Sequence, residues 1–131
     1  GKAYGYGRIG SIKEMALLDY LDIIKRSLEV DRVIVYGNRN RIVERVAVCG
    51  GSGASFIYDA YKRGADLYIT GDVKYHDAQY ANELGLTLVD AGHYHTEKVI
   101  LPIIKDYLDK ILENKVEIYL HDKSSPPFAF Y

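Results

Sequence analysis

The sequence has no excess of charge of either sign, no long apolar run and only one cysteine. Its 17 basic and 18 acidic residues give a formal net charge of -1, so no long-range positive field draws the whole molecule to nucleic acid or anionic lipid. The single Cys49 excludes an internal disulfide and fits a reducing compartment. No apolar stretch approaches the roughly 18 residues that span a bilayer, and the chain does not open on a basic segment followed by an apolar one. We therefore expect a cytoplasmic protein without a signal peptide or a membrane partner.

The length and composition suit one compact domain. A chain of 131 residues buries roughly two-thirds of its unfolded surface on folding. Hydrophobic residues make up 48% and charged residues 27% of the chain, which is close to the globular average and argues against disorder. We expect residues 1–131 to form a single domain.

Strand and helix patterns alternate through most of the chain. Apolar strands are predicted at residues 46–48, 67–69 and 86–89, each followed by a short loop and a helical segment, and a last strand is predicted at 116–120. Strict alternation of this kind is the signature of parallel βαβ units. The predicted fold class is therefore α/β, with a largely parallel sheet and helices on its faces.

The loops after the first three of these strands are predicted neighbours. Right-handed crossovers bring residues 49–55, 70–76 and 90–97 to one edge of the sheet, at the carboxyl ends of the strands. Ligands of open α/β sheets bind at this edge. We therefore expect the functional site there.

The remaining segments predict two helices and two strands. Ser11–Glu14 matches a capping box, and apolar residues then recur at three- and four-residue steps, which predicts a helix from Ser11 to about Glu29. Strands at 32–36 and 42–48 either form a hairpin or lie side by side in one sheet. A last helix is predicted from Thr96 to Glu113, where Pro102 would kink the first turns because it has no backbone N–H.

Asp90 to Glu97 is the segment richest in metal-ligand side chains. His93 and Glu97 offer an imidazole nitrogen and a carboxylate oxygen, which suit zinc, manganese, iron or similar divalent ions. In a helix these two share a face, whereas in an extended segment His95 joins them. We favour His93 with Glu97, because Thr96 is a good N-cap and the helix must begin nearby. An exposed loop that binds nothing is the competing interpretation.

The two neighbouring loops add further candidates. Asp72 and His76 are candidate catalytic groups, although for Asp72 capping of the following helix is favoured, and Asp90 has the same two interpretations. The glycine-rich loop Gly50–Gly53 could present N–H groups to an anion, but it lacks the Gly-Lys-Ser/Thr ending of a P-loop, and a tight structural turn is favoured. For Cys49 a structural role is favoured over that of a nucleophile.

Four blocks of the chain, in order, carry a resemblance to a known family. They are Gly7–Gly10, Val46–Gly53, Gly64–His76 and Asp90–Glu97, and they resemble successive motifs of the Nif-three-like proteins, also labelled GTP cyclohydrolase I type 2 homologues. The resemblance covers nearly the whole chain but only the C-terminal half of the family. It implies that the N-terminal half, with its own metal ligands, is absent from this chain, which would make the chain a fragment or one part of a split protein.

The resemblance implies an α/β fold, a homohexameric ring and a dinuclear centre with two divalent metal ions. The His and Glu of the family's metal motif fall on His93 and Glu97, so the resemblance implies that these residues are ligands. The family's other ligands, an adjacent His pair and an Asp, belong to the N-terminal half, and no adjacent His pair occurs in this sequence. The chain is thus expected to hold half of the centre.

Two functions stay open. The first is metal-dependent hydrolysis of a small molecule, either GTP cyclohydrolase-like or on another phosphate-containing compound, since water between two metal ions ionises near neutral pH. The second is a nucleic-acid or protein interaction module with a structural metal site. In that case Arg39, Arg41 and Arg45 would contact phosphates, whereas the simpler interpretation of these arginines is a solvated turn.

Overall fold

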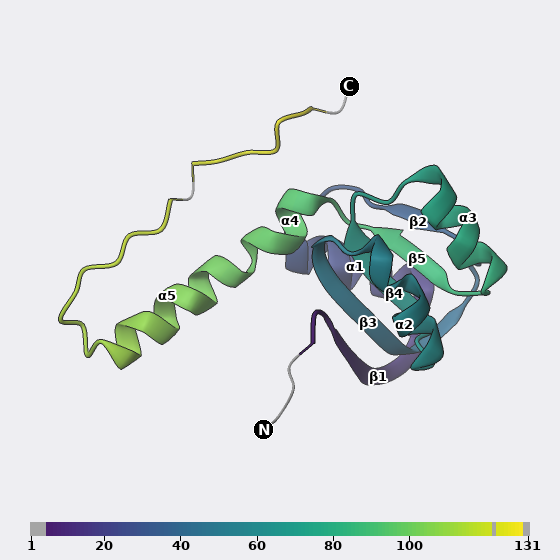
Figure 1. Ribbon diagram of the computed structural model, residues 1–131, viewed down its shortest axis with the longest axis horizontal. Helices are drawn as coiled ribbons and strands as arrows, with labels where there is room; N and C mark the ends of the chain where they lie inside the picture. The colour runs from purple at the N-terminus through teal and green to yellow at the C-terminus, as the bar shows by residue number, and fades with distance from the viewer. Residues whose placement is uncertain (1–4, 122, 130–131) are drawn as a thin grey trace.

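The computed structural model describes residues 5–121 and 123–129. It consists of an α/β body and a C-terminal helical arm that leads away from it (Figure 1). In chain order the elements are β1 (Arg8–Ala16), α1 (Leu17–Leu28), β2 (Ile34–Tyr36), β3 (Ile42–Ser52), a short 3-10 turn η1 (Ala54–Phe56), α2 (Ile57–Lys62), β4 (Leu67–Gly71), α3 (Tyr75–Glu83), β5 (Thr87–Asp90), α4 (His93–Lys98) and α5 (Ile100–Ile111).

One five-stranded sheet with the order β1-β3-β4-β5-β2 forms the centre of the body. The three inner strands run parallel, whereas β1 and β2 pair antiparallel with β3 and β5 at the two edges. The predicted α/β class is confirmed, but the sheet is mixed, and the largely parallel sheet is correct only for its centre. Because β1 and β2 are antiparallel to their neighbours, they pair in the sheet without the βαβ crossover that two parallel strands require. Since β2 lies beside β5, it forms no hairpin with β3.

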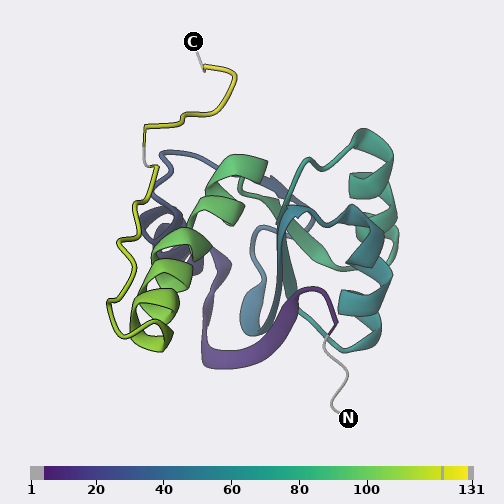
Figure 2. The same ribbon diagram turned by 60° about the vertical axis from the view of Figure 1, so that its left-hand side comes forward.

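The core has two layers, one on each face of the sheet. Because neighbouring side chains of a strand point to opposite faces, Leu67 and Val89 pack with α1 in one apolar cluster, while Tyr68 and Leu88 pack with α2 and α3 in the other. Figure 2 shows α1 and the α2–α3 pair on opposite sides of the sheet. All five residues of β4 are buried, so this strand is the middle of the fold.

The helix predicted from Ser11 to Glu29 was wrong over its first turns. Residues Ser11 and Met15 belong to β1 and pair with Arg45 and Val43, and the register shifts between them. This irregularity, typical of a β-bulge, changes which side of the strand a residue faces, so apolar residues three positions apart are compatible with a strand as well as with a helix. Pairing with β3 outweighs the local helical pattern, and α1 begins only at Leu17.

The C-terminal region differs from its prediction in one element. The predicted strand at 116–120 has no strand geometry, because the arm leads the chain away from the sheet edges, where a neighbouring strand would supply hydrogen bonds. The last helix is broken at Val99, between α4 and α5, and Pro102 cannot donate to the Lys98 carbonyl group, as expected. Among the helices that the structure describes, none has the length and apolar character needed to cross a membrane.

The burial of β4 predicts a large cost for truncating its side chains. Leu67 is 0% exposed, whereas Ile34 on the edge strand β2 is 54% exposed. We expect Leu67→Ala to lower the free energy of unfolding by about 2 to 5 kcal/mol, and Ile34→Ala to lower it by less than about 1 kcal/mol, both measured by urea denaturation. Equal losses in the two variants would contradict the assignment of β4 to the centre of the core.

Candidate metal centre

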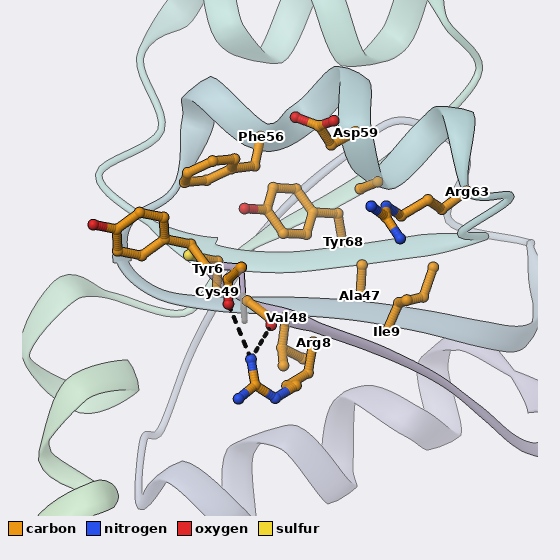
Figure 3. A pocket seen from close by; sticks show the side chains of 13 residues that line it. Tyr6, Arg8, Ile9, Ala47, Val48, Cys49, Phe56, Asp59, Arg63 and Tyr68 are labelled. Carbon is orange, nitrogen blue, oxygen red and sulfur yellow. Dashed lines mark hydrogen bonds between the residues drawn. The ribbon is translucent and has the colours of Figure 1, made fainter. Parts of the chain in front are cut away.

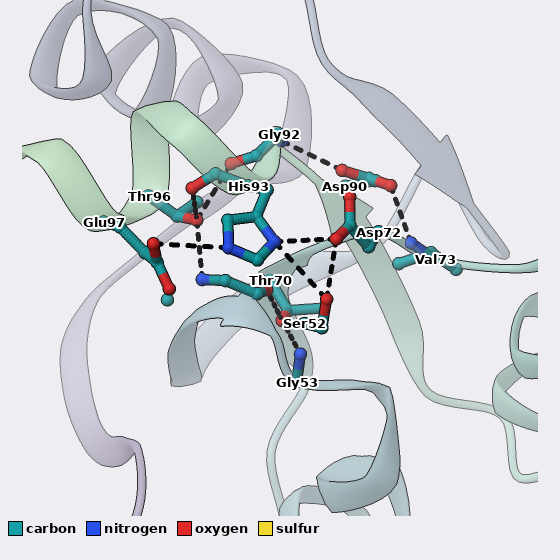
Figure 4. A network of polar contacts seen from close by, with 12 residues as sticks. Ser52, Gly53, Thr70, Asp72, Val73, Asp90, Gly92, His93, Thr96 and Glu97 are labelled. Atoms are coloured by element: carbon teal, nitrogen blue, oxygen red, sulfur yellow. Dashed lines mark hydrogen bonds and ion pairs between the residues drawn. The ribbon is translucent and has the colours of Figure 1, made fainter. Parts of the chain in front are cut away.

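The ends of three parallel strands bring the polar side chains of the site together. Ser52 ends β3, Asp72 follows β4, and His93 begins α4, three residues after Asp90 ends β5. Figure 4 shows these three side chains meeting at one edge of the sheet. The prediction that the three loops are neighbours is therefore confirmed by direct contacts between them.

The imidazole of His93 lies between two carboxylates. Its Nδ1 atom is 2.6 Å from Asp72 Oδ2, and its Nε2 atom is 3.2 Å from Glu97 Oε2. The Ser52 hydroxyl donates to the same Asp72 oxygen at 2.6 Å and lies 3.3 Å from His93 Nδ1. Sequence reasoning gave Ser52 no role of its own, and its only sign was a hydroxyl within the predicted glycine-rich loop Gly50–Gly53.

Hydrogen bonds shift the protonation equilibria of this network. The Ser52 hydroxyl, followed by His93, lowers the pKa of Asp72, against a smaller opposing effect of burial. The hydrogen bond to Asp72 raises the pKa of His93, with Glu97 acting in the same direction and burial opposing them. The surroundings of the imidazole therefore favour a positive charge on or beside the ring.

The segment that carries the two candidate ligand pairings is helical from His93 to Lys98. His93 and Glu97 lie one turn apart on the same face of α4, while His95 points elsewhere, with its Nδ1 atom buried and without a hydrogen-bond partner in the described part of the chain. The reason we gave for this pairing was wrong in detail. Gly92, not Thr96, holds the N-cap position, with φ at 83°, and Thr96 lies inside the helix.

Gly50 and Gly51 lie at the end of β3, so the turn predicted over Gly50–Gly53 is wrong at these residues, and α4 packs against the end of the strand. The N–H of Gly51 donates to Thr96 Oγ1 at 2.9 Å, and the N–H of Gly53 donates to Thr70 Oγ1 at 2.9 Å. A Cβ atom on Gly51, where φ is 67°, would collide with the Glu97 carboxylate. Because the N–H groups of Gly51 and Gly53 already have partners within the protein, this segment is a poor anion cradle.

Asp90 has a structural role as well. Its two carboxylate oxygens accept hydrogen bonds from the backbone N–H groups of Val73 and Gly92, each at 2.9 Å. It thereby connects the loop that carries Asp72 to the loop that carries His93. Asp72 itself caps no helix. It adopts a left-handed backbone with φ at 55°, a region that Asp tolerates better than most residues.

The other candidate residues lie outside this network. His76 is exposed on α3, where its Nδ1 atom is 3.0 Å from Gln79 Oε1. Arg41 donates to the carbonyl groups of Asp66 and Gly85, and Arg45 donates to that of Arg63. Two arginines of the proposed nucleic-acid patch thus connect loops within the fold, which weakens the case for that patch.

A second hollow lies between β1, β3 and α2 (Figure 3). This pocket has a volume of about 590 Å³, and the rings of Tyr6 and Phe56 stand 5.7 Å apart in its wall. Burial raises the pKa of Tyr68, whose hydroxyl donates to the Gly53 carbonyl group at 2.7 Å. Cys49 is half-buried in this wall, in contact with the apolar cluster, which agrees with a structural role.

The donor set of the described chain fits half of a metal centre. Among residues 5–121 and 123–129 no group of three His, Cys, Asp or Glu side chains is arranged to hold a metal ion. His93 and Glu97 supply one nitrogen and one oxygen, a mixed pair that suits zinc, iron or manganese. The carboxylate on the other ring nitrogen is the usual outer partner of a metal-binding histidine.

Sequence comparison relates the chain to one protein family. The family model described as Duf34/NIF3 (NGG1p interacting factor 3) matches residues 2–127. A protein from Clostridium perfringens described as a GTP cyclohydrolase 1 type 2 homolog is 36% identical over 127 residues, which are 96% of this chain and 48% of that protein. A Bacillus subtilis protein with the same description is 38% identical over 130 residues, 96% of this chain and 35% of that protein. The chain therefore spans between a third and a half of the length of these relatives.

Solved structures show the same relationship. A Bacillus cereus protein related to NIF3 is 37% identical and superposes with a TM-score of 0.87, covering 97% of this chain and 36% of that protein. Reduced HcgD from Methanocaldococcus jannaschii is 34% identical with a TM-score of 0.70, covering 81% of this chain and 43% of that protein.

The close approach of α4 to the end of β4 predicts a position-specific cost of a methyl group. A Cβ atom on Gly71 would stand 2.6 Å from the backbone nitrogen of His93, whereas one on Gly10 in β1 would meet nothing within 4 Å, and neither glycine has a positive φ. We expect Gly71→Ala to lower the free energy of unfolding by about 1 to 3 kcal/mol more than Gly10→Ala, because the backbone of His93 cannot move aside without a shift of α4. Urea denaturation of both variants measures the difference, and equal losses would show that α4 does not press on the end of β4.

Proposed function

The chain belongs to the Duf34/NIF3 family, and from this membership and the geometry of His93 we propose that it contributes half of a dinuclear divalent-metal site. His93 and Glu97 are the ligands from this chain. The remaining ligands come from a part of the protein outside residues 1–131. We further propose hydrolysis as the reaction, in keeping with relatives described as GTP cyclohydrolase 1 type 2 homologs.

The observation that carries the metal proposal is the contact between His93 Nε2 and Glu97 Oε2. If Asp72 holds a proton on Nδ1, Nε2 presents a lone pair to a carboxylate oxygen 3.2 Å away. Two such atoms repel unless a cation, either a proton or a metal ion, lies beside them. A divalent ion satisfies both atoms and leaves the Asp72 hydrogen bond in place.

In this proposal the side chains of the chain bind and orient. Ser52 holds the Asp72 carboxylate, Asp72 fixes the tautomer of His93, and the imidazole directs Nε2 toward the Glu97 side of the ring. Metal ions bound there would supply a hydroxide and polarise the substrate. Asp72 acts as a positioning residue. We assign no role to His76, which has its hydrogen bond on α3.

The substrate class follows from the family and from the charges near the site. Asp72, Glu97 and Glu29 surround the groove next to His93, and the one lysine among them, Lys98, is paired with Glu29 at 2.9 Å. A phosphate-containing substrate would therefore depend on the metal ions for charge compensation. We propose a small phosphate-containing compound, with GTP as the first to be tested.

Removing either ligand is expected to empty the metal site. In the intact protein His93→Ala and Glu97→Ala should each lower the bound metal at least about tenfold, measured by elemental analysis after dialysis. His76→Ala is the control, because it removes an exposed histidine that lies on α3. Unchanged metal content in both ligand variants would rule out this assignment, and hydrolysis of GTP by the metal-loaded protein should disappear together with the metal.

Asp72→Asn should weaken metal binding without removing a ligand. The amide keeps the shape of the carboxylate but loses its charge, so we expect the metal dissociation constant to rise about 10- to 100-fold. Nitrogen NMR of the metal-free protein should show a smaller fraction of the Nδ1–H tautomer of His93. A purely structural role of Asp72 would change stability and leave the tautomer unchanged.

A further inference from the structure

The hollow between β1, β3 and α2 has an aromatic wall. Phe56 and the ring of Tyr68 line it, and Tyr6 stands at its rim, where it is 86% exposed. The rings of Tyr6 and Phe56 lie 5.7 Å apart, tilted by 30°, and together they form one side of the hollow (Figure 3). The volume of about 590 Å³ falls within the range of roughly 300–1,000 Å³ that is usual for small-molecule pockets.

Contacts of the backbone hold the rim of this hollow in place. The Arg8 guanidinium donates to the carbonyl groups of Gly5 and Gly7, on either side of Tyr6, at 3.2 and 2.6 Å. Gly7 has φ at 70°, and a Cβ atom there would stand 2.7 Å from the Val48 carbonyl oxygen. The segment can therefore lie this close to β3 only because residue 7 is a glycine. As a result, Tyr6 is positioned at the mouth of the hollow.

Three charged side chains line the same hollow, two of them positive. Asp59 and Arg63 lie four residues apart, on α2 and at its C-cap, a spacing at which opposite charges commonly pair. They form no ion pair with each other in the described structure, so both can reach a ligand. Arg8 donates to carbonyl groups, which leave its charge in place. The lining thus favours a ligand with a negative group, while Asp59 requires N–H donors on the same ligand.

We propose that this hollow binds a purine mononucleotide, with guanosine monophosphate (GMP) as the best fit. The base stacks on the wall of Tyr6 and Phe56, and the phosphate pairs with the guanidinium of Arg63. The Asp59 carboxylate accepts hydrogen bonds from the base. Guanine offers this carboxylate two adjacent N–H donor groups, whereas adenine offers only its amino group.

Simpler ligands satisfy only part of this lining. A nucleoside lacks the negative group for Arg63, inorganic phosphate has no face that stacks on a ring, and an aromatic carboxylate has no N–H donor for Asp59. Neither His93 nor Glu97 lines the hollow, so the inference does not rest on the proposed metal centre.

Isothermal titration calorimetry of the intact protein in the presence of EDTA tests the ligand, because the chelator removes metal ions that could hold the phosphate elsewhere. We expect GMP to bind with a dissociation constant below about 1 mM. Guanosine and inorganic phosphate should each bind at least about tenfold more weakly. Absence of GMP binding, equal binding of guanosine or phosphate, or tighter binding of L-tryptophan would overturn the proposal.

Two pairs of surface variants test the contacts. Tyr6→Ala should raise the dissociation constant for GMP at least about fivefold through lost stacking, and Arg63→Ala at least about tenfold through the lost phosphate contact. The matched controls are Tyr75→Ala, at a tyrosine that is 74% exposed on α3, and Arg39→Ala, at an exposed arginine outside the lining. Unchanged affinity in both pocket variants, or equal weakening in the controls, would contradict binding in this hollow.

The preference for the base tests the role of Asp59. GMP should bind about tenfold more tightly than AMP, and Asp59→Asn should remove most of this preference, because an amide has one acceptor atom in place of two. The same preference in Asp59→Asn, or none in the unchanged protein, would contradict this contact.

A variant of the metal centre separates this proposal from the proposed function. His93→Ala should leave the affinity for GMP in EDTA unchanged, although it is expected to empty the metal site. A loss of GMP binding in this variant would place the nucleotide at the metal centre and overturn the assignment to the hollow, without affecting the metal assignment.

Discussion

The site depends on how closely α4 approaches the ends of β3 and β4. The helix can begin at this edge only because the strand ends carry glycines. A Cβ atom on Gly71 would stand 2.6 Å from the backbone nitrogen of His93, and one on Gly51 would overlap the Glu97 carboxylate. Because glycine has no side chain, the first turn of the helix can lie against the sheet. This position places the imidazole of His93 between Asp72 and Glu97. The chemistry of the site is thus a consequence of backbone packing.

The same packing explains which parts of the site could be predicted from the sequence. The order of strands and loops predicts that residues near 52, 72 and 93 meet, because the carboxyl ends of parallel strands share one edge. The pairing of His93 with Glu97 requires only that the segment is helical. Ser52 could not be identified, since a hydroxyl gains its role from the carboxylate that happens to face it. The roles of Asp90 and Thr96 were also not foreseen, because both depend on backbone N–H groups from distant loops.

The errors in the fold have a common physical cause. The apolar pattern of Ile12 and Met15 suits a helix, but a shift in register lets β1 satisfy it while pairing with β3. The segment 116–120 has the composition of a strand, yet a strand exists only where a neighbour supplies hydrogen bonds. Both cases depend on long-range partners that local periodicity does not report. In contrast, β4 and β5 are strands with neighbours on both sides, and their apolar runs predict them correctly.

The Asp90 carboxylate stabilises the geometry of the site indirectly, through the backbone next to Asp72 and His93. One oxygen holds Val73, next to Asp72, and the other holds Gly92, next to His93. The spacing of Asp72 and His93 therefore depends on Asp90 as well as on their own hydrogen bond.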